Sequence, residues 1–284
     1  MQESEVVRAI AAALTIATSQ GLAAEDALVL QNSNKLSLRI TPCDVLARVA
    51  PPTLDGARRG AQFEIDLAQH LAEAGGPVGR LDPRVAPRDY DQDGHAVTLW
   101  TYSEPVSQQI APAAYATALS QLHAGMRQVD LPTPHFTERV ASAQQLVADR
   151  ERTPDLPESK RQLLDDTLRT SSEAIEERGA PEQLLHGEPH PGNLLSTPHG
   201  PRFIDLETCC RGPVEFDLAH APAEVADHYL DVDQELLRDC RILMLAIIVM
   251  WRWDKDDQLP NGRALGDEWF TQLCEALDSG TQGS

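Results

Sequence analysis

Near its middle the chain reads His186-Gly187-Glu188-Pro189-His190-Pro191-Gly192-Asn193, and a short spacer later it reads Ile204-Asp205-Leu206-Glu207. A carboxylate can orient a hydroxyl group and accept its proton, which is the task of a general base. Carboxylate and amide oxygens are also the ligands that Mg²⁺ prefers in proteins. The stretch therefore predicts a general base at Glu188, followed by ligands for a divalent ion.

The residues around the second carboxylate predict how the metal ligands come together. Leu194-Leu195 begins one candidate strand and Phe203-Ile204 ends another. A hairpin of these two strands would bring Asp205 beside Asn193. We therefore expect Asn193, Asp205 and Glu207 to be the metal ligands, as in an enzyme of phosphoryl transfer.

The pattern continues beyond this segment. The order His-Gly-acid-x-His-x-x-Asn, then Ile-Asp-x-Glu, is followed by Gly212-Pro213 and by Phe216-Asp217-Leu218-Ala219. Together these motifs resemble the aminoglycoside phosphotransferase and choline kinase family. The resemblance implies a protein-kinase-like bilobal fold, ATP and Mg²⁺ as cofactors, and transfer of a phosphoryl group to a hydroxyl.

The resemblance also implies roles for single residues. Glu188 takes the place of the catalytic base, and Asp217 that of a structural residue. Asn193 and Asp205 match metal ligands of the family. These roles agree with those read from the side-chain chemistry.

One departure from the family concerns the base, because the family normally has Asp where this chain has Glu188. The extra methylene moves the carboxylate by about a bond length, and such a misplacement can cost on the order of 100-fold in rate. Either the loop is reset around the longer acid and the enzyme is active, or the chain has drifted toward weak or no transfer. The intact metal-binding pattern favours activity.

A second departure is Arg48, which stands where kinase-like folds carry a lysine that grips the α and β phosphates. Glu64, on the helix expected to follow, matches the ion-pair partner of that lysine. Arginine keeps the charge and adds a bidentate fork, although the two side chains are not interchangeable. The alternative interpretation is a surface arginine on a strand and a glutamate on a helix face.

The other nucleotide-binding signals are weaker. The stretch Gln31-Asn32-Ser33-Asn34-Lys35 fits a phosphate-facing turn but lacks the GxGxxG pattern, so a plain hairpin turn is an equal alternative. Trp100-Thr101-Tyr102 falls where the family's hinge pairs with adenine, and a buried aromatic residue is the alternative there. The residues that we predict to bind the nucleotide are Arg48, Glu64, Ser33, Asn34, Trp100 and Tyr102.

The residue patterns predict an α+β fold with two lobes. A β-rich amino-terminal lobe, residues 1–104, would bind the nucleotide, and a mainly helical lobe, residues 105–284, would carry catalysis and acceptor binding. Before residue 104 we expect an opening helix around 9–17, strands at 28–40, 44–50, 85–90 and 95–101, and a helix at 58–74. After it we expect helices at 113–126, 137–150, 157–178, 217–230, 234–253 and 267–277.

Composition excludes several classes of protein. The 284 residues are 42% hydrophobic and 24% charged, as in ordinary globular proteins. A net charge of −20 repels phosphate backbones and anionic lipid, so we expect neither a nucleic-acid nor a membrane partner. The five cysteines form no zinc-binding or disulfide pattern. The cytoplasm is the expected compartment.

Acidic side chains are frequent in the later helices, which build the acceptor pocket in this fold. They are Glu215, Glu224, Asp227, Asp231, Asp233, Glu235, Asp254, Asp256 and Asp257. Such carboxylates suit an amine-bearing acceptor, although the helix surfaces of any acidic protein look the same. The leading hypothesis is an ATP-dependent O-phosphotransferase for a small hydroxylated molecule, cationic and aminoglycoside-like. The alternatives are a metabolic kinase for choline, homoserine or a sugar-like alcohol, and a nucleotide-binding regulatory pseudokinase.

Overall fold

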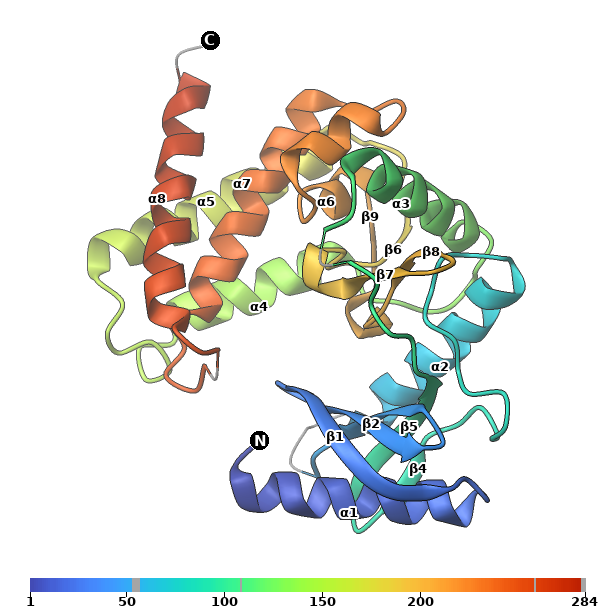
Figure 1. Cartoon of the computed structure of the whole chain (residues 1–284). Coiled ribbons are helices and arrows are strands. Elements are labelled where there is room, and N and C mark those ends of the chain that lie inside the picture. The colour runs from blue at the N-terminus through green and yellow to red at the C-terminus, as the bar shows by residue number, and fades with distance from the viewer. Residues whose placement is uncertain (53–56, 108, 258, 282–284) are drawn as a thin grey trace. The chain divides into compact units, whose positions relative to one another are not determined.

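The computed structural model describes residues 1–52, 57–107, 109–257 and 259–281, which fall into two compact units. The first unit comprises Met1–Ala114, Ala124–Leu131 and Gly192–Thr208. The second comprises Tyr115–His123, Pro132–Pro191 and Cys209–Ser284. The expected α+β composition, with a β-rich first part and a mainly helical second part, is confirmed (Figure 1). The assignment of separate functions to residues on either side of position 104 stays a prediction.

An antiparallel sheet of five strands forms the frame of the first unit, in the order β1-β2-β3-β5-β4. The strands are β1 (Ala24–Asn32), β2 (Leu36–Pro42), β3 (Val45–Ala50), β4 (Tyr90–Gln92) and β5 (His95–Thr101). Buried and half-buried side chains alternate along β2 and β3, because successive side chains point to opposite faces of a sheet. One face therefore presents an apolar surface that must be covered.

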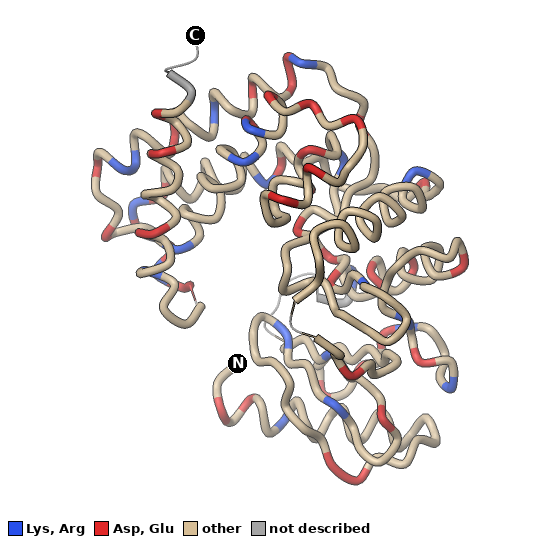
Figure 2. The backbone as a smooth tube through the Cα atoms, turned by 45° about the horizontal axis from the view of Figure 1, so that its top comes forward, with Lys and Arg blue, Asp and Glu red and all other residues tan. Residues whose placement is uncertain are grey.

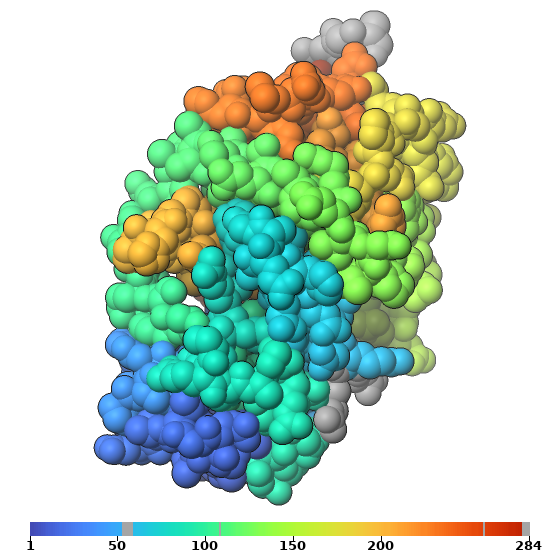
Figure 3. All heavy atoms as spheres, turned by 90° about the vertical axis from the view of Figure 1, so that its right-hand side faces the viewer, coloured from blue at the N-terminus to red at the C-terminus, as the bar shows by residue number. Residues whose placement is uncertain are grey.

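The helix α1 (Glu3–Ser19) covers that apolar face (Figure 1). Its small and aliphatic residues, such as Ala13 and Ile16, are buried against Leu38 and Val49 of the sheet. The predicted opening helix is thus confirmed. Figure 3 shows the amino-terminal segments in blue closely packed with the teal segments that follow α2 in this unit.

A second helix and a separate hairpin also belong to the first unit. Helix α2 (Ala57–Glu73) is confirmed almost as predicted, and it contacts β5. The expected hairpin is also confirmed as β7 (Leu194–Thr197) and β8 (Gly200–Phe203), with Leu194 opposite Phe203. The backbone N–H of Phe203 donates to Pro77 O at 2.7 Å, which ties the hairpin to the segment after α2.

Two strand predictions in the first unit are wrong. The stretch 28–40 is not one strand, because the turn at Ser33 and Asn34 divides it into β1 and β2. The stretch 85–90 is not a strand either, since strand pairing begins only at Tyr90. Local hydrogen bonds occupy that segment instead, and they include one from Arg88 N to Ala86 O on either side of a proline.

Helices make up most of the second unit. They are the Tyr115–His123 part of α3 (Pro112–Met126) and the helices α4 (Phe136–Ala148), α5 (Glu158–Glu177), α7 (Gln234–Trp251) and α8 (Gly262–Thr281), and all five helices were predicted. Strand β6 (Gln183–Leu185) precedes the central motif, His186–Asn193, and strand β9 (Cys210–Gly212) follows it. The two strands pair with each other, and the central motif contains the single-turn helix η1 (Pro191–Asn193).

The predicted helix at 217–230 is wrong. The chain forms the short helix α6 (Val214–Leu218) and then the 3₁₀ helix η3 (Ala223–His228). Pro222 lies between them, and proline cannot donate the backbone hydrogen bond that a continuous helix needs. The break leaves Asp217 at the end of a short helix beside the central motif.

Across the part of the chain that the structure describes, no helix is both long enough and apolar enough to cross a bilayer. The apolar run of α7 packs within the second unit, where Leu243, Ala246 and Met250 are buried.

Two leucines on neighbouring strands test the role of the face that α1 covers. Leu38 is 0% exposed and Leu28 is 59% exposed. We expect Leu38→Ala to lower the free energy of unfolding by about 2–5 kcal/mol, because it leaves a cavity under α1. The matched control Leu28→Ala should change it by less than about 0.5 kcal/mol. Urea unfolding measures both, and equal losses would contradict this assignment of the core.

Candidate active site

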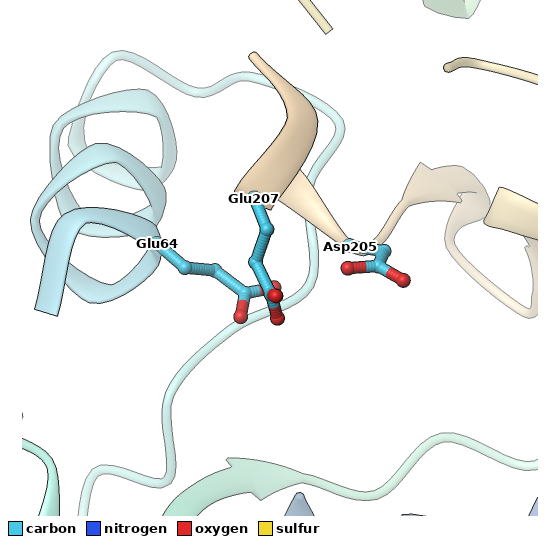
Figure 4. A group of neighbouring side chains, drawn as sticks. All are labelled: Glu64, Asp205 and Glu207. Carbon is cyan, nitrogen blue, oxygen red and sulfur yellow. The ribbon is translucent and has the colours of Figure 1, made fainter. Parts of the chain in front are cut away.

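Three carboxylates of the first unit meet at one point. Glu64 extends from α2, Asp205 lies in the loop after β8, and Glu207 belongs to the single-turn helix η2 (Leu206–Thr208). One oxygen of each lies within 4.8 Å of the others (Figure 4). Glu64 is buried, whereas Asp205 and Glu207 are half-buried and so reachable from solvent. The structure thus brings together two of the predicted metal ligands and a predicted nucleotide-binding residue.

Arg48, which lies on β3, contacts all three carboxylates. Its Nη1 donates to Glu64, and its Nη2 donates to Asp205 Oδ1 at 2.9 Å and lies 3.3 Å from Glu207 Oε1. Burial by itself would lower the pKa of Arg48, but the three carboxylates raise it far above its ordinary value. Arg48 is therefore a fixed cation, and its planar fork is suited to hold several carboxylates in one arrangement.

Lys35 is a second cation in this cluster, and the sequence analysis did not assign it a function. Its ammonium group contacts Glu207 Oε1 and lies 4.0 Å from Glu64 Oε2. Lys35 is only 6% exposed, which is unusual for a lysine without a partner. The sequence contained a partial signal, because the alternation of β2 puts Lys35 on the same face as Ser37, but that position identifies no partner.

Glu64 is the most deeply buried carboxylate of the cluster. Burial raises the pKa of its carboxyl above the ordinary value, and the charge of Arg48 opposes that shift only in part. Its Oε2 has no hydrogen-bond partner although it is buried. An orphaned buried carboxylate oxygen beside two other carboxylates fits a divalent cation, which takes oxygen ligands.

The backbone at Asp205 is held in an uncommon conformation, with φ of 65°. Aspartate tolerates this left-handed region better than most residues, but a non-glycine residue there still costs on the order of 1–3 kcal/mol. The turn directs the chain from β8 into η2, where the N–H of Leu206 donates to Glu64 Oε1 at 3.3 Å. Glu64 therefore holds both Arg48 and the metal-ligand loop.

Three further predicted residues of the first unit are Asn193, Ser33 and Asn34. Asn193 is next to Asp205, since its backbone oxygen accepts a hydrogen bond from Ile204 N at 3.0 Å. Ser33 and Asn34 form the turn between β1 and β2, and Lys35 follows directly. The Ser33 N–H is already used within the turn, where it donates to Lys35 O at 3.1 Å. Contact of Ser33 and Asn34 with phosphate stays a prediction.

The two predicted hinge aromatics have partners of their own. Trp100 is buried, and its Nε1 donates to Thr98 Oγ1 at 2.8 Å. Tyr102 lies beyond β5, donates to Glu104 Oε2 at 2.8 Å, and has the guanidinium of Arg39 over its ring. These contacts give the aromatic side chains structural roles. Nucleotide binding by Trp100 and Tyr102 therefore stays a prediction about their backbone.

The predicted base, Glu188, belongs to the second unit. Arg139 of α4 donates to its Oε1 and, through the other terminal nitrogen, to the backbone oxygen of Gly187 at 2.8 Å. The ring of Trp251 supports the guanidinium from one side. Sequence reasoning missed Arg139, because it lies far from the motif in sequence and no local pattern marks it.

Asp217 organises the loop that carries Glu188. Its carboxylate accepts the backbone N–H groups of His186 at 2.8 Å and Gly187 at 2.7 Å, and it lies 2.9 Å from Nε2 of His123. Burial would raise the pKa of Asp217, but His123 and these hydrogen bonds together lower it below its ordinary value. The structural role implied by the resemblance agrees with these contacts.

Charges elsewhere are spread over both units, as Figure 2 shows by the red and blue positions along the backbone. Several carboxylates of the predicted acceptor region already have partners. Glu215 is buried and accepts the N–H of Asp233, while Asp233 and Glu235 pair with Arg178. Asp254 and Asp257 pair with arginines in the same way.

A comparison with protein families finds that the model described as the Phosphotransferase enzyme family matches residues 28–238. Among solved structures, a choline/ethanolamine kinase family protein from Mesorhizobium loti shares 17% identity, covers 96% of this chain and 95% of its own, and gives a TM-score of 0.69. A choline kinase from Streptococcus pneumoniae shares 14% identity, covers 93% and 96%, and gives 0.68.

An amicoumacin kinase in complex with AMP-PNP, Ca²⁺ and Ami is similarly close, with 12% identity, 96% coverage of both chains and a TM-score of 0.68. At such identities the likeness concerns the fold. The protein-kinase-like fold expected from the sequence is confirmed.

Replacing Asp217 with Asn tests its role in the loop. We expect a loss of about 2–4 kcal/mol in the free energy of unfolding, because an amide N–H would face backbone N–H donors. The wild-type carboxyl has a lowered pKa, so its contribution is complete above the ordinary value of 3.8 and is lost as pH falls below it. The difference between the variants should therefore shrink in acid.

Urea unfolding from roughly pH 3 to pH 7 measures this difference. Glu173→Gln on the exposed side of α5 is the matched control and should show little loss at any pH. A loss for Asp217→Asn that stays constant down to pH 3 would contradict the proposed charge state.

Proposed function

We propose that this chain, which belongs to the Phosphotransferase enzyme family, is an ATP-dependent O-phosphotransferase that moves the γ-phosphate to a hydroxyl of a small, cationic molecule. Family membership makes it a phosphotransferase with an alcohol group as acceptor. The nucleotide, the metal and the acceptor are the parts of the proposal that need their own support.

The observation that carries the proposal is the charged cluster of the first unit. Phosphoryl transfer requires cations that hold phosphate oxygens and carboxylates that hold a divalent ion. Arg48 is such a cation, Asp205 and Glu207 are such carboxylates, and Glu64 lies beside all three. A purely structural ion-pair network would not leave a buried oxygen of Glu64 without a hydrogen bond and with its ammonium neighbour 4.0 Å away.

We assign each residue of the cluster a task. Asn193, Asp205 and Glu207 would hold Mg²⁺, which when bound neutralises charge on the phosphates. Arg48 binds phosphate oxygens and Glu64 positions its guanidinium, as the lysine and glutamate of kinase-like enzymes do. Oxygen ligands and a half-exposed position agree with Mg²⁺ or Ca²⁺, and the amicoumacin kinase similar to this chain contains Ca²⁺.

Glu188 is the base in this proposal, and Arg139 compensates for its extra methylene. The guanidinium contacts both the carboxylate and the backbone of Gly187, so it fixes the longer side chain relative to its own loop. A carboxylate held in this way can orient a hydroxyl group and accept its proton. This arrangement supports the active interpretation over the drifted one.

The proposal of a cationic acceptor rests on fewer carboxylates than the sequence suggested. Arg178 neutralises Asp233 and Glu235, and Glu215 is buried. The other exposed acids of this region are Glu224, Asp227, Asp231 and Asp256. The choline/ethanolamine kinase family protein and the aminoglycoside phosphotransferases similar in fold make an amino alcohol or an aminoglycoside the first acceptors to test.

An acceptor screen by mass spectrometry tests the function directly. Purified protein with ATP and Mg²⁺ is incubated with aminoglycosides, choline, ethanolamine, homoserine and sugar-like alcohols, and a gain of one phosphate is sought. Transfer to an amine-bearing alcohol would support the proposal, and transfer to an uncharged alcohol would favour the metabolic kinase. Nucleotide binding without transfer to any acceptor would favour the pseudokinase.

Replacing Glu188 separates catalysis from binding. We expect Glu188→Gln to lower kcat by about 10²–10⁴-fold, because the amide cannot accept the proton of the hydroxyl. The Kd for ATP should stay close to that of the wild type. Steady-state kinetics and calorimetry give the two values.

The matched control Glu173→Gln removes an exposed carboxylate from the same unit and should leave both values unchanged. The variant Glu188→Asp tests the departure from the family. If it gained transfer activity that the wild type lacks, the pseudokinase would replace the proposed enzyme.

A further inference from the structure

The buried ammonium of Lys35 is the feature that the proposed function leaves unused. It contacts Glu207 and is 4.0 Å from the orphaned Oε2 of Glu64. It therefore lies among the same carboxylates whose oxygens form the candidate metal cluster. A lysine in that place acts as a counter-ion for carboxylates that would otherwise repel each other.

The charges of the cluster do not balance with the residues present. Glu64, Asp205 and Glu207 supply the negative charges, and Arg48 and Lys35 supply the positive ones, which leaves an excess of one negative charge. A divalent cation that replaced Lys35 would bring this net charge to zero. The displaced ammonium of Lys35 would then be available to phosphate.

The two cations differ in how firmly they are held. Arg48 donates to Glu64 and Asp205 and lies close to Glu207, so its fork is fully engaged. Lys35 is a point charge on a flexible stem, and among the residues that the structure describes its ammonium contacts only Glu207 and, more distantly, Glu64. Lys35 can therefore leave the cluster while Arg48 keeps its frame.

Lys35 lies at the start of β2, next to the turn of Ser33 and Asn34. It precedes β2 directly after the Ser33 and Asn34 turn, and Ser37 of β2 lies opposite Arg48. Because side chains alternate along a strand, Lys35 and Ser37 share the face that carries Arg48. Lys35 thus lies between the turn predicted to face phosphate and the metal cluster.

We propose that Lys35 occupies the place of the divalent ion in the nucleotide-free protein and becomes a phosphate-binding residue when the metal–nucleotide complex binds. This inference rests on the proposed function, since it assumes a nucleoside triphosphate with its divalent ion as the ligand. Lys35 would exchange the Glu207 carboxylate for phosphate oxygens. It thereby makes metal binding without nucleotide unfavourable.

Binding of Mn²⁺ alone, measured by electron paramagnetic resonance on the full chain, tests whether Lys35 occupies the place of the divalent ion. Mn²⁺ accepts the same oxygen ligands as Mg²⁺. We expect Lys35→Met to raise Mn²⁺ affinity by roughly tenfold, because the competing charge is gone. The control Lys255→Met removes the same charge from an exposed position and should show no such gain.

Calorimetry with AMP-PNP and Mg²⁺ tests whether Lys35 binds phosphate when the nucleotide is present. We expect Lys35→Met to weaken nucleotide binding by about tenfold through loss of a charged contact, and Lys255→Met to leave it unchanged. Equal Mn²⁺ affinity in the two variants would overturn the placeholder role. Unchanged nucleotide affinity in Lys35→Met would overturn the phosphate-binding role.

If Lys35→Met failed to fold, Lys35→Arg would carry the test. A bidentate fork should hold Glu207 more tightly than an ammonium does and so lower Mn²⁺ affinity by about threefold. Unchanged Mn²⁺ affinity in this variant would overturn the inference. A wild type with the expected Lys35 dependence that transfers phosphate to no acceptor would support the inference and contradict the proposed function.

Discussion

The ion pair between Arg48 and Glu64 is the interaction on which the first unit's site depends. It joins β3 to α2, and Glu64 also accepts the N–H of Leu206, which fixes the loop of Asp205 and Glu207. Such a buried pair contributes little net stability, because desolvation of both charges offsets their attraction. Loss of either partner would nevertheless leave an uncompensated charge, so the pair specifies one arrangement of these elements.

The second unit holds its part of the motif by a related device. Asp217 is a buried carboxylate that accepts two backbone N–H groups of the loop before Glu188 and lies beside His123. Arg139 then fixes the Glu188 side chain from α4. In both units a buried charge therefore positions a more exposed one.

Most of the fold was predictable because its elements are marked by local patterns. Alternating burial along β2 and β3 and the apolar stripes of α1 and α2 appear directly in the sequence. Prediction of element boundaries failed where a turn or a proline interrupts an apparently continuous strand or helix. The Ser33 turn divides one apparent strand, and Pro222 divides one apparent helix.

The sequence by itself determined the fold class, the family and the roles proposed for Glu188, Asn193, Asp205 and Glu207, because these residues lie at fixed spacing in one motif. Only the tertiary structure decided which distant residues act on them. Lys35 and Arg139 become partners of Glu207 and Glu188 through strand pairing and helix packing. No sequence spacing encodes a contact between residues that meet only after the chain has folded, so their roles depended on the structure.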